Sequence, residues 1–208
     1  MNADVCLPPQ RKTVCSYPRV LRLIHGLFGG IFRLAGWQFA ESAPLERKYV
    51  MVVARHTSNW DFFVMVVLAA SLGRQVRFMG KHSLFIGPLG SLLRWLGGIA
   101  VERSSQHNFV EQMVAQFADT DDMVLIIAPE GTRKAVPCWK GGFYHIALGA
   151  GVAVVPVYLD YGRKRAGFGE PCMPSGDLQS DLPRIQQCYA GVQARHPEGD
   201  SSHPDKQA

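Results

Sequence analysis

Strand-like and helix-like segments alternate through the middle of the chain. Residues 49–54 are apolar or aromatic and include three valines, which is typical of a strand buried on both faces. Further strand-like stretches follow at residues 74–80, 97–103, 123–128 and 152–158. Between these strands, apolar runs long enough for a helix or apolar residues at helical spacing are found at residues 62–72, 105–119 and 139–150. This alternation predicts an α/β fold in which a mixed, mostly parallel sheet is flanked by helices.

The N-terminal part of the chain contains one amphipathic segment. Residues 1–17 are polar and contain prolines, so we expect a flexible N-terminus, whereas residues 18–40 have helical periodicity. At about 100° per residue, one face collects Val20, Ile24, Leu27, Phe28, Ile31 and Ala35. Arg22 and Arg33 fall nearly opposite. Such a helix can lie in a membrane interface, or it can pack on the domain itself, where its glycines allow close approach.

The remainder of the chain is expected to form one domain at residues 41–195. From Gly162 onward the composition becomes polar and rich in proline and glycine, and a last helix is expected at residues 181–195. Residues 196–208 lack apolar residues almost entirely, so we expect a disordered tail.

The strand at residues 49–54 is followed by a polar turn that carries a histidine. His56 and Asp61 would lie about 140° apart on a continuous helix and on opposite faces of a continuous strand. They can meet only where a strand turns into a helix, and Ser58 with Asp61 resembles the capping box that starts a helix. A carboxylate beside a histidine fixes the imidazole tautomer and stabilises its cation, which suits general-base catalysis. Alternatively, His56 is a turn residue and Asp61 only caps the helix.

Composition narrows the classes of function. A length of 208 residues suits one domain, and no run of 18 apolar residues predicts a membrane span. The net charge of +5 favours anionic partners such as phospholipid, nucleotide or an acidic carrier protein. Nucleic acid is not favoured, because no basic stripe is interleaved with aromatics. The five cysteines are odd in number and form no CxxC motif, which argues against a disulfide framework and favours a reducing compartment.

Polar clusters follow two further strands. Glu102-Arg103 ends one, and Glu130-Gly131-Thr132-Arg133 directly follows another. Parallel strands would place both clusters at the same sheet edge as His56 and Asp61. Two arginines, a threonine hydroxyl and a backbone opened by glycine suit a phosphate group. The alternative for each arginine is a solvated ion pair.

On these residues the sequence resembles the glycerophospholipid acyltransferase family, which contains the 1-acylglycerol-3-phosphate (PlsC-like) acyltransferases. Four ordered blocks carry the resemblance: H-x4-D at His56 and Asp61, a glycine-led apolar run at 98–103, P-E-G-T-R at 129–133 and V-P-V at 155–157. The family's Lys-x-Gly corresponds to Lys140-Gly141-Gly142, and a later Gly-Glu-Pro to residues 169–171. Ala128 departs from the family pattern, which has an aromatic residue before the third block.

The resemblance implies the glycerol-phosphate acyltransferase fold with an N-terminal membrane-docking helix. It implies acyl transfer from acyl-coenzyme A or acyl carrier protein to the hydroxyl of a lysophospholipid, by default 1-acyl-sn-glycerol-3-phosphate, which gives phosphatidic acid. Another acceptor, such as a lyso-ornithine lipid, stays open. His56 and Asp61 would be catalytic, without cofactor or metal, at the cytoplasmic face of the membrane. The acceptor's phosphate would be bound by Arg103, Glu130, Gly131, Thr132 and Arg133.

Two further groups of residues have candidate binding roles. A groove for the acyl chain or donor is suggested by Lys81, Leu84, Phe85, Trp95 and Lys140, although ordinary core packing explains scattered apolar residues equally well. The basic run at residues 163–165 could dock an acidic carrier protein or anionic lipid, or form a solvated loop.

Two other classes compete with the acyltransferase hypothesis. A metal-dependent hydrolase would use His56 and Asp61 as ligands, but metal sites usually need three or four, and the other histidines are unclustered. A non-catalytic membrane-binding module would explain the basic amphipathic helix. It gives no reason for the polar residues at the strand ends.

Overall fold

The computed structural model describes residues 13–39, 44–54, 58, 60–101, 106–132 and 136–196. Its strands are β1 (Gln38–Phe39), β2 (Lys48–Val53), β3 (Val76–Lys81), β4 (Gly98–Val101), β5 (Met123–Ile127), β6 (Ala153–Asp160) and β7 (Arg165–Phe168). Its helices are α1 (Pro18–Leu34), α2 (Trp60–Leu72), α3 (Gly87–Trp95), α4 (Gln106–Ala118), α5 (Gly142–Ala150) and α6 (Leu178–Gln186). Short 3-10 turns are η1 (Val14–Ser16), η2 (His82–Phe85) and η3 (Gln187–Tyr189).

The described strands form one sheet in the order β1-β7-β6-β2-β5-β3-β4. Neighbours among β6, β2, β5, β3 and β4 are parallel, whereas β7 pairs antiparallel with β6 and parallel with β1. The predicted α/β fold with a mixed, mostly parallel sheet is therefore confirmed. All five strands expected from the hydrophobic pattern are the parallel ones, so their carboxyl ends lie at a single edge of the sheet.

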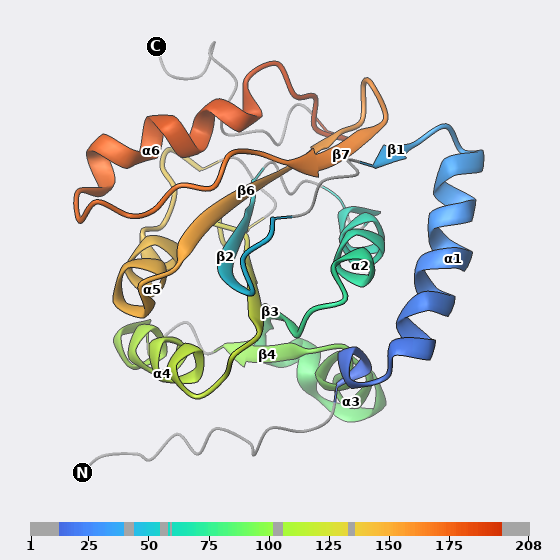
Figure 1. Ribbon diagram of the computed structural model, residues 1–208, viewed down its shortest axis with the longest axis horizontal. Helices are drawn as coiled ribbons and strands as arrows, with labels where there is room; N and C mark the ends of the chain where they lie inside the picture. The colour runs from blue at the N-terminus through green and yellow to red at the C-terminus, as the bar shows by residue number, and fades with distance from the viewer. Residues whose placement is uncertain are drawn as a thin grey trace.

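Strand β2 lies between β5 and β6 and is buried on both faces. Val50 and Val52 point into the core formed with α4 and α5, and Tyr49, Met51 and Val53 point into the core formed with α2. Figure 1 shows the two layers, with α4 and α5 on one side of the sheet and α2 and α1 on the other. Successive side chains of a strand point to opposite faces, so a run that is apolar at every position requires cover on both.

Helix α1 packs on α2 with a different face from the one expected. Leu21 and Gly29 are buried, and Ile24, Phe28 and Phe32 are half-buried. Leu23, Leu27, Ile31 and Leu34 are exposed, the last at 91% of its surface. The predicted face therefore combined residues from two apolar stripes. No helix in the described part of the chain is long and apolar enough to cross a membrane.

Three further expectations need correction. The N-terminus was expected to be flexible up to residue 17, but Thr13 and Val14 are buried and η1 begins at Val14. The last helix, expected at residues 181–195, begins at Leu178 and ends at Gln186, and the 3-10 turn η3 follows it directly. Residues 165–168, in the region described only as polar and rich in proline and glycine, form β7. Gln38 and Phe39 pair with it, so the N-terminal segment contributes a strand to the domain's sheet. Residues 1–12 and 197–208 lie outside the described part.

The Phe85 side chain is buried against glycines of three elements, Gly80 in β3, Gly90 in α3 and Gly98 in β4. A Cβ added to Gly80 would lie 2.8 Å from the Phe85 ring, and one added to Gly98 would lie 2.7 Å from it. A Cβ on Gly90 would meet the Phe85 backbone itself. Gly26, in the exposed part of α1, has no atom within 4 Å of that position.

Gly90→Ala and Gly26→Ala should therefore change stability in opposite directions. Overpacking against fixed backbone costs about 1–3 kcal/mol, so Gly90→Ala should lower the free energy of unfolding by at least that amount. Gly26→Ala should raise it by up to about 1 kcal/mol, because alanine has the better helix propensity. Urea unfolding of both variants measures the two effects. Equal stability of the Gly90 variant and the wild type would contradict the packing around Phe85.

Candidate active site

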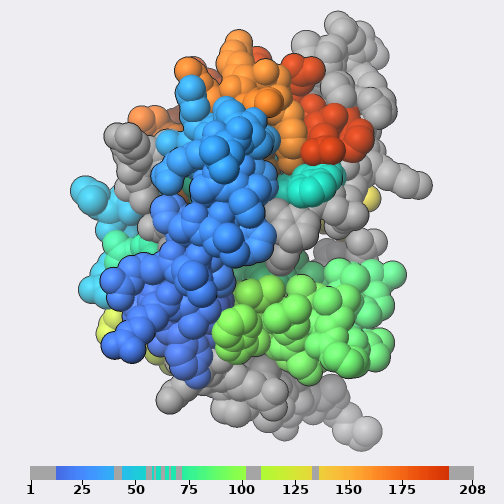
Figure 2. Space-filling model, turned by 90° about the vertical axis from the view of Figure 1, so that its right-hand side faces the viewer, coloured from blue at the N-terminus to red at the C-terminus, as the bar shows by residue number. Residues whose placement is uncertain are grey.

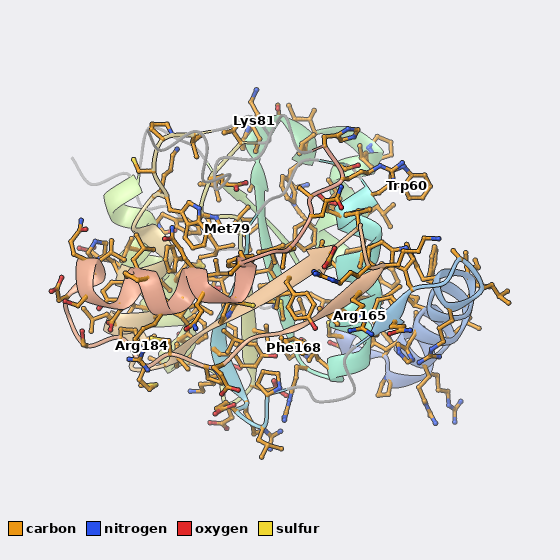
Figure 3. All side chains as sticks on the ribbon, turned by 90° about the horizontal axis from the view of Figure 1, so that it is seen from above. Trp60, Met79, Lys81, Arg165, Phe168 and Arg184 are labelled. Carbon is orange, nitrogen blue, oxygen red and sulfur yellow. The ribbon has the colours of Figure 1, made fainter. Side chains whose placement is uncertain are left out.

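The carboxyl edge of the parallel strands collects the polar residues. Asp61 follows β2, Glu130 follows β5 and Tyr161 follows β6, while Lys81 ends β3. Figure 3 shows Lys81 at the end of β3 and Trp60 at the start of α2 along this edge. Ligand sites of open α/β sheets lie in this position, so this edge is the candidate active site.

Asp61 is the best-defined side chain of the site. It is only 1% exposed. Its Oδ2 accepts a hydrogen bond from the Ser58 backbone N–H at 2.8 Å, and the Ser58 hydroxyl accepts one from the Trp60 N–H at 3.2 Å. The first is the carboxylate contact expected of a capping box, the second is an N-cap contact to the N–H two residues on, and together they fix the start of α2. Its Oδ1 accepts a hydrogen bond of 2.6 Å from the Tyr161 hydroxyl.

Tyr161 was missed by the sequence analysis. It lies 100 residues from its partner, Asp61, and no local pattern marks it. Burial, and next the hydrogen bond to Asp61, raise the pKa of the Tyr161 phenol well above its ordinary value, so the hydroxyl remains a donor at neutral pH. The only signal in the sequence is its position directly after a buried parallel strand.

The turn after β5 contains the second cluster. Glu130 is 4% exposed, and its charge acts on the nearby Tyr189, whose pKa is raised first by its own burial. Gly131 has a φ of 62°, which favours glycine, and its N–H donates to the Ala128 carbonyl at 3.1 Å. The Lys140 backbone N–H donates to the Pro129 carbonyl at 2.9 Å, and the Lys140 Nζ lies 3.3 Å from where a Gly131 Cβ would be. An ammonium group thus stands beside the Glu130 turn.

Several predicted site residues lie outside the described part of the chain. These are His56, Arg103 and Arg133. Their roles, and the expected contact between His56 and Asp61, remain predictions. The described members of the set, Asp61, Glu130, Gly131 and Thr132, follow the carboxyl ends of two adjacent strands, β2 and β5.

The residues suggested for an acyl or donor groove divide into two places. Lys81, Leu84 and Trp95 are at or near the surface around η2 and α3, and Phe85 is buried at 2% exposure beneath them. Lys140 instead lies beside Gly131. Only Leu84 and Trp95 of the apolar candidates therefore present substantial surface, and the groove itself remains a prediction.

The basic run at residues 163–165 makes contacts within the chain. Arg163 pairs with Asp160 at 3.0 Å and donates to the Gly191 carbonyl. Lys164 donates to the Ala35 carbonyl at 2.9 Å, and Arg165 donates to the Gln38 side chain at 3.0 Å. These cations tie the turn after β6 to α1, β1 and the C-terminal segment. Docking of an acidic partner by this run remains a prediction.

Two findings concern metal and cysteine chemistry in the described residues. No group of three or more histidine, cysteine, aspartate or glutamate side chains there could hold a metal ion. The cysteines in this part, Cys15, Cys138, Cys172 and Cys188, are free thiols. Burial raises the pKa of Cys188 to about 11, which keeps it in the unreactive thiol form.

The fold and the strand-edge site define an α/β protein with its candidate active site at the carboxyl ends of parallel strands. A family model described as Acyltransferase matches residues 28–160, and the chain belongs to this family. The match includes all of the H-x4-D, P-E-G-T-R and V-P-V blocks.

Characterised relatives and one solved structure are similar to the chain. A 1-acyl-sn-glycerol-3-phosphate acyltransferase from Haemophilus influenzae is 27% identical over 150 residues, which cover 67% of this chain and 61% of that protein. The human 1-acyl-sn-glycerol-3-phosphate acyltransferase alpha is 32% identical over 126 residues, covering 58% and 43%. The crystal structure of the 1-acyl-sn-glycerophosphate acyltransferase PlsC from Thermotoga maritima has the same fold, with a TM-score of 0.58, 22% identity and coverage of 81% and 76%. The chain thus spans less than two thirds of the two relatives' lengths.

The contacts of Asp160 hold the C-terminal segment against this edge. Asp160 is buried and accepts hydrogen bonds from Arg163 and from the Gln193 N–H. Burial alone would raise the pKa of Asp160, but these hydrogen bonds more than offset it, so the pKa lies below its usual value. A carboxylate with a depressed native pKa stabilises the fold above the unfolded pKa of about 3.9, and this contribution is lost as the pH falls through the native pKa.

Asp160→Asn should lower the free energy of unfolding by about 1–3 kcal/mol at pH 7, because Arg163 loses its charged acceptor. Part of the acid sensitivity below about pH 4 should disappear with it. Denaturant unfolding at intervals from pH 7 to pH 3 tests both effects. Asp119→Asn, an exposed carboxylate after α4, is the control and should behave like the wild type. An Asp160 variant with wild-type stability at pH 7 would contradict the role of these contacts.

Proposed function

We propose that this protein is an O-acyltransferase that moves a fatty acyl group from acyl-coenzyme A or acyl carrier protein to the free hydroxyl of a lysophospholipid. The proposed acceptor is 1-acyl-sn-glycerol-3-phosphate, and the product is phosphatidic acid. The main support is the buried Asp61 carboxylate at the carboxyl end of β2, five residues after His56 and inside the family-matched region. The names of the relatives support the acceptor.

The proposed mechanism is direct attack by the acceptor hydroxyl. His56 takes the hydroxyl proton while Asp61 orients the imidazole and stabilises its cation. The oxygen forms a bond to the thioester carbonyl carbon, which gives a tetrahedral intermediate with its negative charge on the former carbonyl oxygen. Collapse breaks the carbon–sulfur bond, and the departing thiolate takes the proton from His56. No acyl-enzyme intermediate is required.

The acceptor's phosphate would lie at the turn after β5. In this proposal Arg103 and Arg133 supply the cations, while Glu130, Gly131 and Thr132 shape the turn. The Lys140 ammonium group beside Gly131 adds positive charge at the same place. An anionic headgroup bound there would sit near Asp61, because β5 and β2 are adjacent parallel strands.

His56→Ala should remove nearly all turnover without unfolding the protein. General-base catalysis contributes about 10²–10⁴-fold, so a loss of this size is expected in kcat. The measurement is an assay of the purified protein that crosses acyl-coenzyme A and acyl-carrier donors with lysophosphatidic acid, other lysophospholipids and a lyso-ornithine lipid. Turnover by the wild type only with a non-phosphorylated acceptor would reject the phosphate site. Near-normal turnover by the His56 variant would reject the mechanism.

We further propose that the face containing α1 and α3 rests on a membrane surface. Figure 2 shows α1 along this face, with the η2–α3 region beside its N-terminal half. The exposed apolar residues there are Leu23, Leu27, Ile31 and Leu34 on α1, and Leu84, Ile86, Leu89, Leu92 and Trp95 on η2 and α3. Arg19, Arg22 and Arg33 are exposed on the same helix, as cations facing anionic headgroups would be.

Leu27→Ser/Ile31→Ser should weaken vesicle binding by about tenfold or more, because each buried apolar side chain contributes on the order of 1–2 kcal/mol. Point substitutions are preferable to deletion of residues 1–40, since β1 pairs with β7 and α1 covers α2. Co-sedimentation with phosphatidylglycerol-containing vesicles is the measurement. Leu148→Ser, an exposed leucine on α5, is the matched control and should bind normally. Equal binding by the double variant and this control would exclude the α1 stripe as the contact.

A further inference from the structure

Each oxygen of the Asp61 carboxylate is held by a different segment of the chain. Oδ2 accepts from the Ser58 N–H, within the turn that starts α2. Oδ1 accepts from the hydroxyl of Tyr161, directly after β6. The first contact fixes the carboxylate relative to its own helix, and the second fixes it relative to the sheet. Both contacts restrain the direction in which the carboxylate points.

Tyr161 is itself held by three contacts, one through its backbone and two through its ring. Its backbone N–H donates to the Gln193 carbonyl at 2.9 Å. Trp37 meets the ring edge-on, with centroids 5.0 Å apart. The Arg195 guanidinium lies 5.7 Å from the Tyr161 ring centroid and 5.5 Å from that of Trp60, so it bridges the two aromatic rings. Such a restrained ring can place its hydroxyl with little freedom.

We propose that Tyr161 is a positioning residue for the acyl-transfer reaction: its hydroxyl holds Asp61 in the orientation in which the carboxylate serves His56, and Arg195 holds Tyr161 in place. This inference rests on the proposed function of His56 and Asp61. Tyr161 and Arg195 both lie beyond residue 160, where the family match ends. The C-terminal segment thereby takes part in organising the site.

The charge distribution around the phenol is consistent with this role. Among the described residues, the titratable and charged groups acting on Tyr161 are Asp61 and Arg195. The hydrogen bond that the Tyr161 hydroxyl donates to Asp61 disperses the negative charge of the carboxylate. Without the hydroxyl, that charge would act more strongly on the His56 imidazole that the proposed mechanism pairs with Asp61, and would favour its cation. A base must be neutral to accept a proton, so the acid limb of the pH–rate profile would move to higher pH.

Tyr161→Phe tests the inference, with Tyr144→Phe as the matched control. The Tyr144 hydroxyl donates to the buried Asp181 at 2.6 Å, the same distance as in the Tyr161–Asp61 pair, but it lies in the core on the opposite face of the sheet. Both variants lose one phenol–carboxylate hydrogen bond. Tyr161→Phe should lower kcat about tenfold with little change in either KM, and should shift the acid limb of the profile to higher pH. Tyr144→Phe should lose stability but retain kcat and the profile.

Wild-type kcat and pH profile in Tyr161→Phe would overturn the inference. Equal losses of kcat in the two variants, without a shift of the profile, would also overturn it, because the effect would then be general destabilisation. Unfolding curves for both variants show whether each is folded under assay conditions. His56→Ala, assayed in parallel, separates the two proposals. If it is inactive while Tyr161→Phe is normal, only the positioning role fails; if it is active, the proposed mechanism fails.

Discussion

A buried carboxylate is the constraint on which the candidate site depends. Removing an ionised carboxylate from water without partners costs several kcal/mol, so Asp61 requires hydrogen bonds to both oxygens. One comes from the turn before α2 and the other from the residue after β6. These two places adjoin because β2 and β6 are neighbouring parallel strands, with Val53 opposite Val157. The polar contact is therefore available only in the correct sheet topology.

The apolar composition of α2 determines how α1 packs. Helix α2 is apolar almost throughout its length, so it requires cover on the side away from the sheet as well. Helix α1 supplies that cover, with Gly29 against Val67 and Phe32 against the core that contains α2, while leaving a second apolar stripe exposed. Packing on the domain uses one face of this helix, and the proposed contact with a membrane would use the other. A single apolar face was predicted for this helix from its sequence, so the buried stripe could not be distinguished from the exposed one.

Local signals in the sequence predicted the parts of the fold that depend on local physics. The continuous apolar run predicted β2, and the Ser58–Asp61 spacing predicted the start of α2 to within two residues. The rule that parallel strands end at one edge predicted that Asp61 and Glu130 follow the same edge of the sheet, and β2 and β5 do pair in parallel. The short strand β7 could not be predicted, because Arg165–Phe168 shows no alternation and is ordered by pairing with β6.

The partners of Asp61 also show that local sequence patterns do not predict contacts between distant segments. Tyr161 follows a predicted strand end, but the choice of Asp61 as its acceptor depends on strand order, which no sequence pattern specified. Lys140 was grouped with residues of η2 and α3 as one candidate groove. Its backbone N–H instead donates to the Pro129 carbonyl, so Lys140 lies at the Glu130 turn. Contacts that join distant segments are decided by the packing of whole elements, and local pattern carries little information about them.

The C-terminal segment joins these parts into one unit. The Tyr189 hydroxyl donates to the Val52 carbonyl at 2.7 Å near the end of β2, and Arg163 links Asp160 to the Gly191 carbonyl. Gln193 and Arg195 then hold Tyr161, which holds Asp61. The residues that match the family end at position 160, yet the orientation of the central carboxylate depends on contacts made after that position. The chemistry and its support are thus encoded in different stretches of the chain, and substitutions in the C-terminal segment can alter the site without touching the family blocks.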